Sequence, residues 1–139
     1  MKDTNNLLDY NVWSCCDYTE TTAGFNGSPI ITNNYSTNGE HCIRLKNDTS
    51  ATTNTYASIP CSANTRYTLI CKIHNPSSAT VLLRDNTWAS SVLYVPSSED
   101  WLDIELSYTT AGTASSIYMQ FNIPPGSDFY VDEICLIKG

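Results

Sequence analysis

Apolar and polar side chains alternate along most of the chain, which is the period of a β-strand with one buried face. The clearest example is residues 116–124, SIYMQFNIP, where Ile, Met, Phe and Ile alternate with Tyr, Gln and Asn. The pattern predicts that the four apolar residues face the core. It also predicts that the polar residues between them, Tyr118, Gln120 and Asn122, face solvent.

Similar runs, separated by turn-forming Gly, Pro, Asn and Ser, occur at 41–47, 55–60, 66–74, 80–86, 91–96, 101–109 and 129–137. No stretch of helical length and periodicity interrupts them. The sequence therefore predicts an all-β fold, a two-sheet antiparallel β-sandwich of eight or nine strands. We expect one domain, 1–139, in which 1–40 is an irregular N-terminal segment with an edge strand and 41–139 holds the main sandwich strands.

Composition narrows the class of partner. The formal charge is −7 with only seven Lys and Arg, so we expect no nucleic acid partner and no anionic membrane partner. Ser, Thr and Asn make up about a third of the residues, and Tyr and Trp are frequent, which suits exposed sheet faces and sugar recognition. The first residues lack the apolar core of a signal peptide, so we expect that the chain is exported inside a larger protein, is cut from one, or does not cross a membrane by that route.

No motif of a known catalytic class is present, neither GxSxG, HExxH, a P-loop nor GxGxxG. The carboxylate pair Glu99-Asp100 lies in an expected turn, and Asp103 and Glu105 lie on an expected wet strand face. Neighbouring carboxylates on one strand do not by themselves flank a glycosidic bond. We therefore expect no enzymatic activity.

Five stretches follow one another in a characteristic order: NLL, NGEHCIRL, SANTRYTLICKI, WLDIELSYT and FYVDEICL. Together they span about residues 6–137, and their succession resembles the jelly-roll carbohydrate-binding modules of the galactose-binding-like superfamily. Modules of this kind are appended to xylanases and glucanases, and similar ones occur in phage tail and microbial surface proteins. The resemblance implies a non-catalytic jelly roll with a glycan groove on its concave sheet. It also implies that Trp101 is a structural core residue.

The resemblance places the strands at 55–59, 80–86 and 92–95 beside the penultimate strand, on the concave sheet. The outward residues of these strands and of one loop are the predicted ligand-binding set: Tyr56, Arg84, Asn86, Trp88, Tyr94, Tyr118, Gln120 and Asn122. Aromatic planes cover the C–H face of a pyranose, while amides and guanidinium groups bond its hydroxyls. Any solvent-facing strand would show the same alternation, so a plain hydrated surface is the alternative.

The adjacent carboxylates Asp132 and Glu133 interrupt the last strand. The resemblance implies that Asp132 ligates a structural calcium near the start of the chain, where Asp9, Glu40, Asn11 or Asn38 could add oxygen ligands. In the family a glutamate commonly follows the early aromatic residue, whereas here Ser14 stands in that place.

A β-bulge is the alternative explanation for the two carboxylates. The inward positions change from Phe129 and Val131 to Ile134 and Leu136, so one residue between them is extra. A bulge would hold a carboxylate at the rim of the sheet without any ion.

The sequence thus favours a module that binds a poly- or oligosaccharide. The alternative is a structural or adhesion domain of a viral tail or microbial surface protein, which would contact other domains of a larger protein. Both hypotheses predict an extracellular, cell-surface or virion-associated location. Three Asn-X-Ser/Thr triplets, at Asn26, Asn34 and Asn47, also fit a surface protein, and the alternative is that a chain this rich in Asn and Ser contains such triplets by chance.

Overall fold

The computed structural model describes residues 7–8, 30–32, 42–75 and 79–139. These residues form nine strands: β1 (Ile30–Thr32), β2 (Cys42–Lys46), β3 (Thr53–Pro60), β4 (Arg66–Asn75), β5 (Ala79–Asp85), β6 (Ser90–Val95), β7 (Ser98–Thr109), β8 (Ser116–Ile123) and β9 (Asp128–Lys138). Within these ranges there is no helix, and no membrane-crossing helix was found among them.

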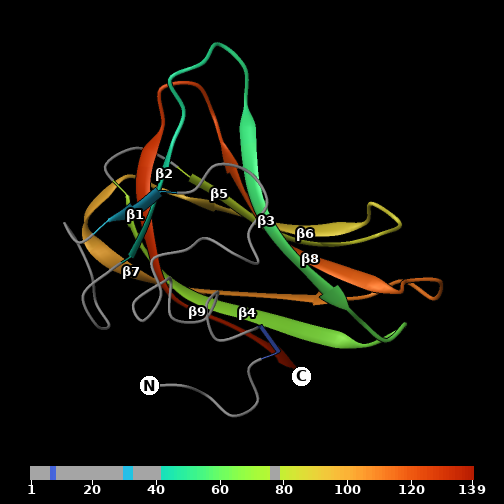
Figure 1. Cartoon of the computed structure of the whole chain (residues 1–139). Coiled ribbons are helices and arrows are strands. Elements are labelled where there is room, and N and C mark those ends of the chain that lie inside the picture. Colours follow the sequence, from blue (N-terminus) through green and yellow to red (C-terminus); the bar gives the residue numbers. More distant parts are fainter. Residues whose placement is uncertain (1–6, 9–29, 33–41, 76–78) are drawn as a thin grey trace.

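The strands form two antiparallel sheets that stack as a sandwich (Figure 1). The five-stranded sheet has the order β1-β2-β9-β4-β7, and the four-stranded sheet has the order β3-β8-β5-β6. The predicted all-β sandwich is therefore confirmed, with nine strands, and β1 is the expected edge strand. The sheet assignment of β3, β5, β6 and β8 also agrees with the expectation that these strands share one layer.

The core lies between the sheets and is built by the predicted inward residues. On β8, Ile117, Met119 and Phe121 are almost fully buried. The ring of Phe121 meets that of Phe129 on β9, with 6.5 Å between centroids. Full burial of side chains of this size stabilises the fold by about 1.5–3 kcal/mol each.

The last strand contains a β-bulge, which is one of the two explanations that the sequence allows for Asp132 and Glu133. Ile70 of β4 pairs with Cys135, but Lys72 pairs with Asp132, so β9 has one residue more than β4 over this span. Glu133 lies at the bulge with φ 51°, in the left-handed region that few non-glycine residues adopt. The extra residue moves the core-facing phase from Val131 to Ile134.

The expectation that Trp101 is a core residue is wrong. β7 begins at Ser98, and Trp101 has the same parity as Asp103, so it faces away from the core. Its ring lies on the outer surface of the five-stranded sheet, 5.6 Å between centroids from the imidazole of His74. The neighbouring residue Leu102 packs against the core instead.

Candidate functional site

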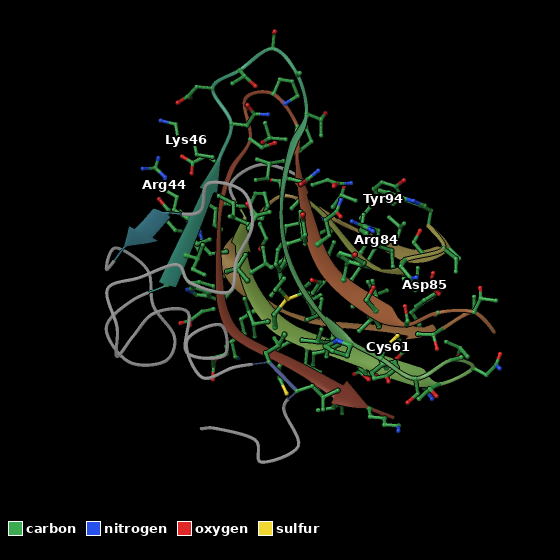
Figure 2. The ribbon with its side chains drawn as sticks, turned by 45° about the vertical axis from the view of Figure 1, so that its right-hand side comes forward. Arg44, Lys46, Cys61, Arg84, Asp85 and Tyr94 are labelled. Carbon is green, nitrogen blue, oxygen red and sulfur yellow. The ribbon has the colours of Figure 1, made fainter. Side chains whose placement is uncertain are left out.

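The outer surface of the four-stranded sheet, which we call the β8 face, displays the predicted ligand-binding residues. Alternation and strand register bring these outward side chains into one layer: Asn54, Tyr56 and Ser58 of β3; Ser116, Tyr118, Gln120 and Asn122 of β8; Thr80, Leu82 and Arg84 of β5; and Ser90, Val92 and Tyr94 of β6. Figure 2 shows Arg84 and Tyr94 on this sheet, near the β5–β6 hairpin. The remaining two predicted residues, Asn86 and Trp88, lie in the turn between β5 and β6.

Arg84 is the centre of an aromatic cluster on the β8 face. Its guanidinium carbon lies 3.9 Å from the ring centroid of Tyr118 and 4.3 Å from that of Trp88. The Tyr56 ring is 5.9 Å away and also contacts Tyr118 at 5.7 Å between centroids. Cation–π contacts at these distances hold the guanidinium group in place.

Two amide side chains of β8, Gln120 and Asn122, lie beside Arg84. We call these three residues the polar strip. Nε of Arg84 donates to Oε1 of Gln120 over 2.9 Å, and Nε2 of Gln120 donates to Oδ1 of Asn122 over 2.8 Å. Gln120 lies on the outward side of β8, but the prediction that it faces solvent is wrong, because its neighbours cover it and only 9% of it is exposed. Gln120 therefore orients the two residues beside it, while Asn122 is half-buried and more accessible.

Trp88 is held in an unusual backbone conformation. Its φ is 70°, in the left-handed region, where a bulky side chain is strained. Its backbone N–H donates to the carbonyl of Asp85 over 3.0 Å, which closes the turn. The residue remains 75% exposed although its ring packs against Arg84, so it is accessible to a ligand.

Asn86 already has partners in the fold. Its Oδ1 accepts the backbone N–H groups of Ser115 and Ser116, at 2.9 and 3.2 Å, and its Nδ2 donates to Ser115 Oγ. These bonds tie the β5–β6 turn to the start of β8. The geometry gives Asn86 a positioning role beside the turn that carries Trp88.

Tyr94 lies on β6, the edge strand of its sheet, and is 77% exposed. Val92, two residues earlier, is also exposed. The β8 face therefore ends in an accessible aromatic ring at the sheet edge. Together with Trp88, Tyr94 provides apolar surface at the margin of the polar strip.

A buried carboxylate, Asp85, anchors this end of the sandwich, and sequence reasoning missed it. Asp85 is fully buried and points to the interior, next to Arg84 in the chain but on the opposite side of the strand. It accepts hydrogen bonds from the Tyr108 hydroxyl at 2.7 Å, from the Ala111 N–H at 2.9 Å and from Thr87. Burial by itself raises the pKa of this carboxyl, but these hydrogen bonds outweigh it and lower the pKa to about 2.

Asn47 plays the corresponding part at the other end of the sandwich. Its Nδ2 donates to the carbonyls of Ala51 and Ile123, each over 2.7 Å, and its Oδ1 accepts from Thr49. The amide is 2% exposed with both N–H groups in use. Asn47 is thus a structural residue of the β2–β3 loop, and its triplet is not a marker of a glycosylated surface. Asn26 and Asn34 lie outside the described residues.

Of the predicted calcium ligands, only Asp132 lies in the described part of the chain. Its carboxylate is fully buried and accepts the backbone N–H of Glu133 over 2.9 Å. A carboxylate in this setting is a suitable oxygen ligand for a hard cation. Asp9 and Glu40 lie outside the described residues, within which no group of three or more acidic, His or Cys side chains could hold a metal. The calcium site stays a prediction.

Solved carbohydrate-binding modules have a similar fold. The C-terminal family 22 carbohydrate-binding module of Clostridium thermocellum Xyn10B matches with a TM-score of 0.68 and 13% identity, over 99% of this chain and 97% of that chain. TmCBM61, solved in complex with beta-1,4-galactotriose, matches with a TM-score of 0.62 and 11% identity, over 99% of this chain and 100% of that chain. The fold is that of the jelly-roll carbohydrate-binding modules.

A viral protein shares this jelly roll. The enzymatically active domain of tailspike protein 4 from bacteriophage CBA120 matches with a TM-score of 0.76 and 15% identity, over 97% of this chain. The matched part is 22% of the solved tailspike chain, so this chain spans about a fifth of the length of that chain. No family model and no curated protein sequence matches the chain.

Proposed function

We propose that this chain is a non-catalytic module that binds an oligo- or polysaccharide on the β8 face. The observation that carries the proposal is the cluster in which Arg84 packs against Tyr118 and Trp88 beside the Gln120–Asn122 pair. It combines exposed aromatic surface with fixed hydrogen-bonding groups on one open sheet. That combination matches a sugar ring, which has apolar C–H faces and a rim of hydroxyls.

The openness of the surface favours a polymer over a small enclosed ligand. The polar strip runs across β5 and β8, and the exposed rings of Trp88 and Tyr94 lie at its margin. Polar groups on such a surface are hydrated before binding, and a ligand must displace that water. We therefore expect affinities in the range of about 1 μM to 1 mM per site.

The solved structures of similar fold support the same class of ligand. One was solved with galactotriose, and another is described as a xylan-binding domain. These chains share less than a fifth of their residues with this one, so they do not indicate which sugar it binds. The residues of the β8 face determine which sugar would bind.

Affinity gel electrophoresis against a set of plant and microbial polysaccharides tests the proposal. We expect retardation by at least one of them, and a loss of about tenfold or more in affinity for Trp88→Ala and for Tyr118→Ala. Trp101→Ala is the matched control, because it removes an aromatic ring from the outer surface of the opposite sheet. If Trp101→Ala weakened binding and the other two variants did not, the β8 face would be the wrong surface.

A structural or adhesion role in a larger extracellular or virion-associated protein is the second candidate. The likeness to a phage tailspike domain favours it, as does the exposed apolar strip of Val92 and Tyr94 on edge strand β6. In that case other domains, and not a glycan, would cover the edge strand. The variant Val92→Ser, which leaves the rings of Trp88 and Tyr94 in place, would then lower association with those domains in analytical ultracentrifugation, whereas a glycan module would keep its polysaccharide retardation pattern unchanged.

A further inference from the structure

The β8 face carries a single charge among the described residues, the guanidinium of Arg84. The described acidic residues lie on β7, on β9 or in the β2–β3 loop, except Asp85, which faces the interior. The chain as a whole has a net charge of −7, so the one cation of this face stands out against an acidic protein. The face is therefore locally suited to a negatively charged group.

Arg84 differs from Arg44 and Lys72, because each of these two cations is paired with a carboxylate. Arg44 makes a two-point ion pair with Asp128, with 2.8 Å between Nε and Oδ1, and Lys72 pairs with Asp103 at 2.9 Å. Among the described residues no carboxylate pairs with Arg84, and its only hydrogen bond runs from Nε to Gln120. The N–H groups on both terminal nitrogens remain available.

The amide pair extends this surplus of donors. Because Gln120 Oε1 accepts from Arg84, the Nε2 group must point to Asn122, whose Oδ1 accepts it. The Nδ2 group of Asn122 then has no bond within the described chain, so the accessible end of the network is a donor. A carboxylate accepts hydrogen bonds and donates none, and its two oxygens match the planar guanidinium fork.

We propose that the ligand of the β8 face is an acidic glycan, in which the carboxylate of a hexuronic acid residue binds Arg84 and the sugar ring rests against the open surface of Trp88. This inference rests on the proposed function and specifies its substrate class. The aromatic rings hold the guanidinium in position before binding, so little side-chain freedom is lost when the carboxylate arrives. The rest of the β8 face is neutral among the described residues, and its aromatic rings would bind acidic and neutral glycans alike. The charge of Arg84 would then favour the acidic glycan.

The test compares uronate polymers with their own neutral forms. Polygalacturonate, alginate and glucuronoxylan are each offered beside the same preparation after chemical reduction of its carboxyl groups to alcohols, which preserves the backbone and its linkages. Isothermal titration calorimetry at 50 mM and 500 mM NaCl measures both forms. We expect at least one acidic polymer to bind about tenfold more tightly than its reduced form, with the difference shrinking at high salt.

Arg84→Met keeps an unbranched apolar stem against Tyr118 but removes the charge, so it should abolish the preference for the acidic form. Arg66→Met is the matched control, because it removes an exposed arginine from the five-stranded sheet, where Arg66 contacts Ser107. Equal melting temperatures for the two variants exclude misfolding as the cause.

The outcomes separate this inference from the function on which it rests. Equal binding of acidic and reduced forms, lost in Trp88→Ala, would overturn the acidic ligand and leave the glycan module intact. A preference that survives Arg84→Met would also overturn it. Binding of no polymer in either form would count against both proposals.

Discussion

The hydroxyl of Tyr108 donates a hydrogen bond to Oδ2 of Asp85 over 2.7 Å, and this bond joins the two sheets. Asp85 ends β5 of the four-stranded sheet, whereas Tyr108 belongs to β7 of the five-stranded sheet. The Ala111 N–H donates to the same oxygen, so the β7–β8 loop is attached as well. This carboxylate therefore fixes the end of the sandwich at which Trp88 and Arg84 lie.

The hydrogen-bonded carboxylate of Asp85 makes the free energy of unfolding depend on pH below about pH 4. Its pKa is about 2 in the folded chain and 3.8 ordinarily, so its contribution is fully present above about pH 4 and is lost as the pH falls towards 2. The loss amounts to about 2 kcal/mol. Urea unfolding of the wild type and Asp85→Asn should show a stability gap at pH 6 that narrows by that amount at pH 2. A gap of constant size would show that folding does not change the pKa of this carboxyl.

Tyr108→Phe removes one donor to the same carboxylate and leaves the ring in the core. We expect a loss of about 2 kcal/mol in the free energy of unfolding, because the partner is a buried charge. Tyr67→Phe serves as the matched control, since the Tyr67 hydroxyl accepts a hydrogen bond from the neutral Ser62 N–H. The control should lose less, and a larger loss in the control would contradict the charge-based explanation.

Asn47→Asp should destabilise the other end of the sandwich. The substitution replaces an amide that donates to two carbonyls with a carboxylate that repels them, at a cost of about 2–4 kcal/mol. Asp48→Asn, at the exposed neighbouring position, is the control and should change stability by less than about 0.5 kcal/mol. Chemical denaturation measures both variants. A near-neutral Asn47→Asp would mean that the Asn47 bonds are replaced by water.

The bulge at Glu133 should accept glycine and reject a β-branched residue. At φ 51° glycine has no steric penalty, so Glu133→Gly should be neutral or stabilising by up to about 1 kcal/mol, whereas Glu133→Val should cost about 1–2 kcal/mol. Melting temperatures give the order of the two variants. The reverse order would place the strain elsewhere in β9.

A calcium ion at Asp132, as the family resemblance implies, would raise the melting temperature in 1 mM CaCl2 over that in EDTA, since an ion that binds only the folded chain stabilises it. The difference should vanish in Asp132→Asn, which keeps the shape of the side chain but loses its charge. Equal melting temperatures of the wild type in the two buffers would remove calcium from the account of this fold.

Much of the fold could be predicted because strand alternation is a local property. The alternation of neighbouring residues alone predicts that Ile117 faces the core and that Tyr118 faces outward. It also predicts that the core-facing positions of β9 shift by one residue around Glu133. For Trp101 the family resemblance and the strand alternation disagree, and the structure follows the alternation. Its alternation with Leu102 and Asp103 already indicated an outward ring.

The roles of Asp85 and Asn47 depend on contacts distant in sequence. Tyr108 and Ala111 are 23 and 26 residues from Asp85, and no local pattern pairs them. One signal was present, however. Asn47 and Asp85 are each followed two positions later by a threonine. In each case Oδ1 accepts hydrogen bonds from the backbone N–H and the hydroxyl of that threonine. Such Asx turns mark an ordered loop, although not what it is attached to.

Arg84 and Asp85 are consecutive residues on one strand, and they therefore point to opposite sides of the sheet. Inserting or deleting one residue within β5, ahead of Arg84, would exchange their positions, so that a carboxylate would lie on the β8 face and a guanidinium would enter the core. Substitutions can thus change this surface one side chain at a time, whereas a change of one residue in the length of the strand reverses which side chains face outward.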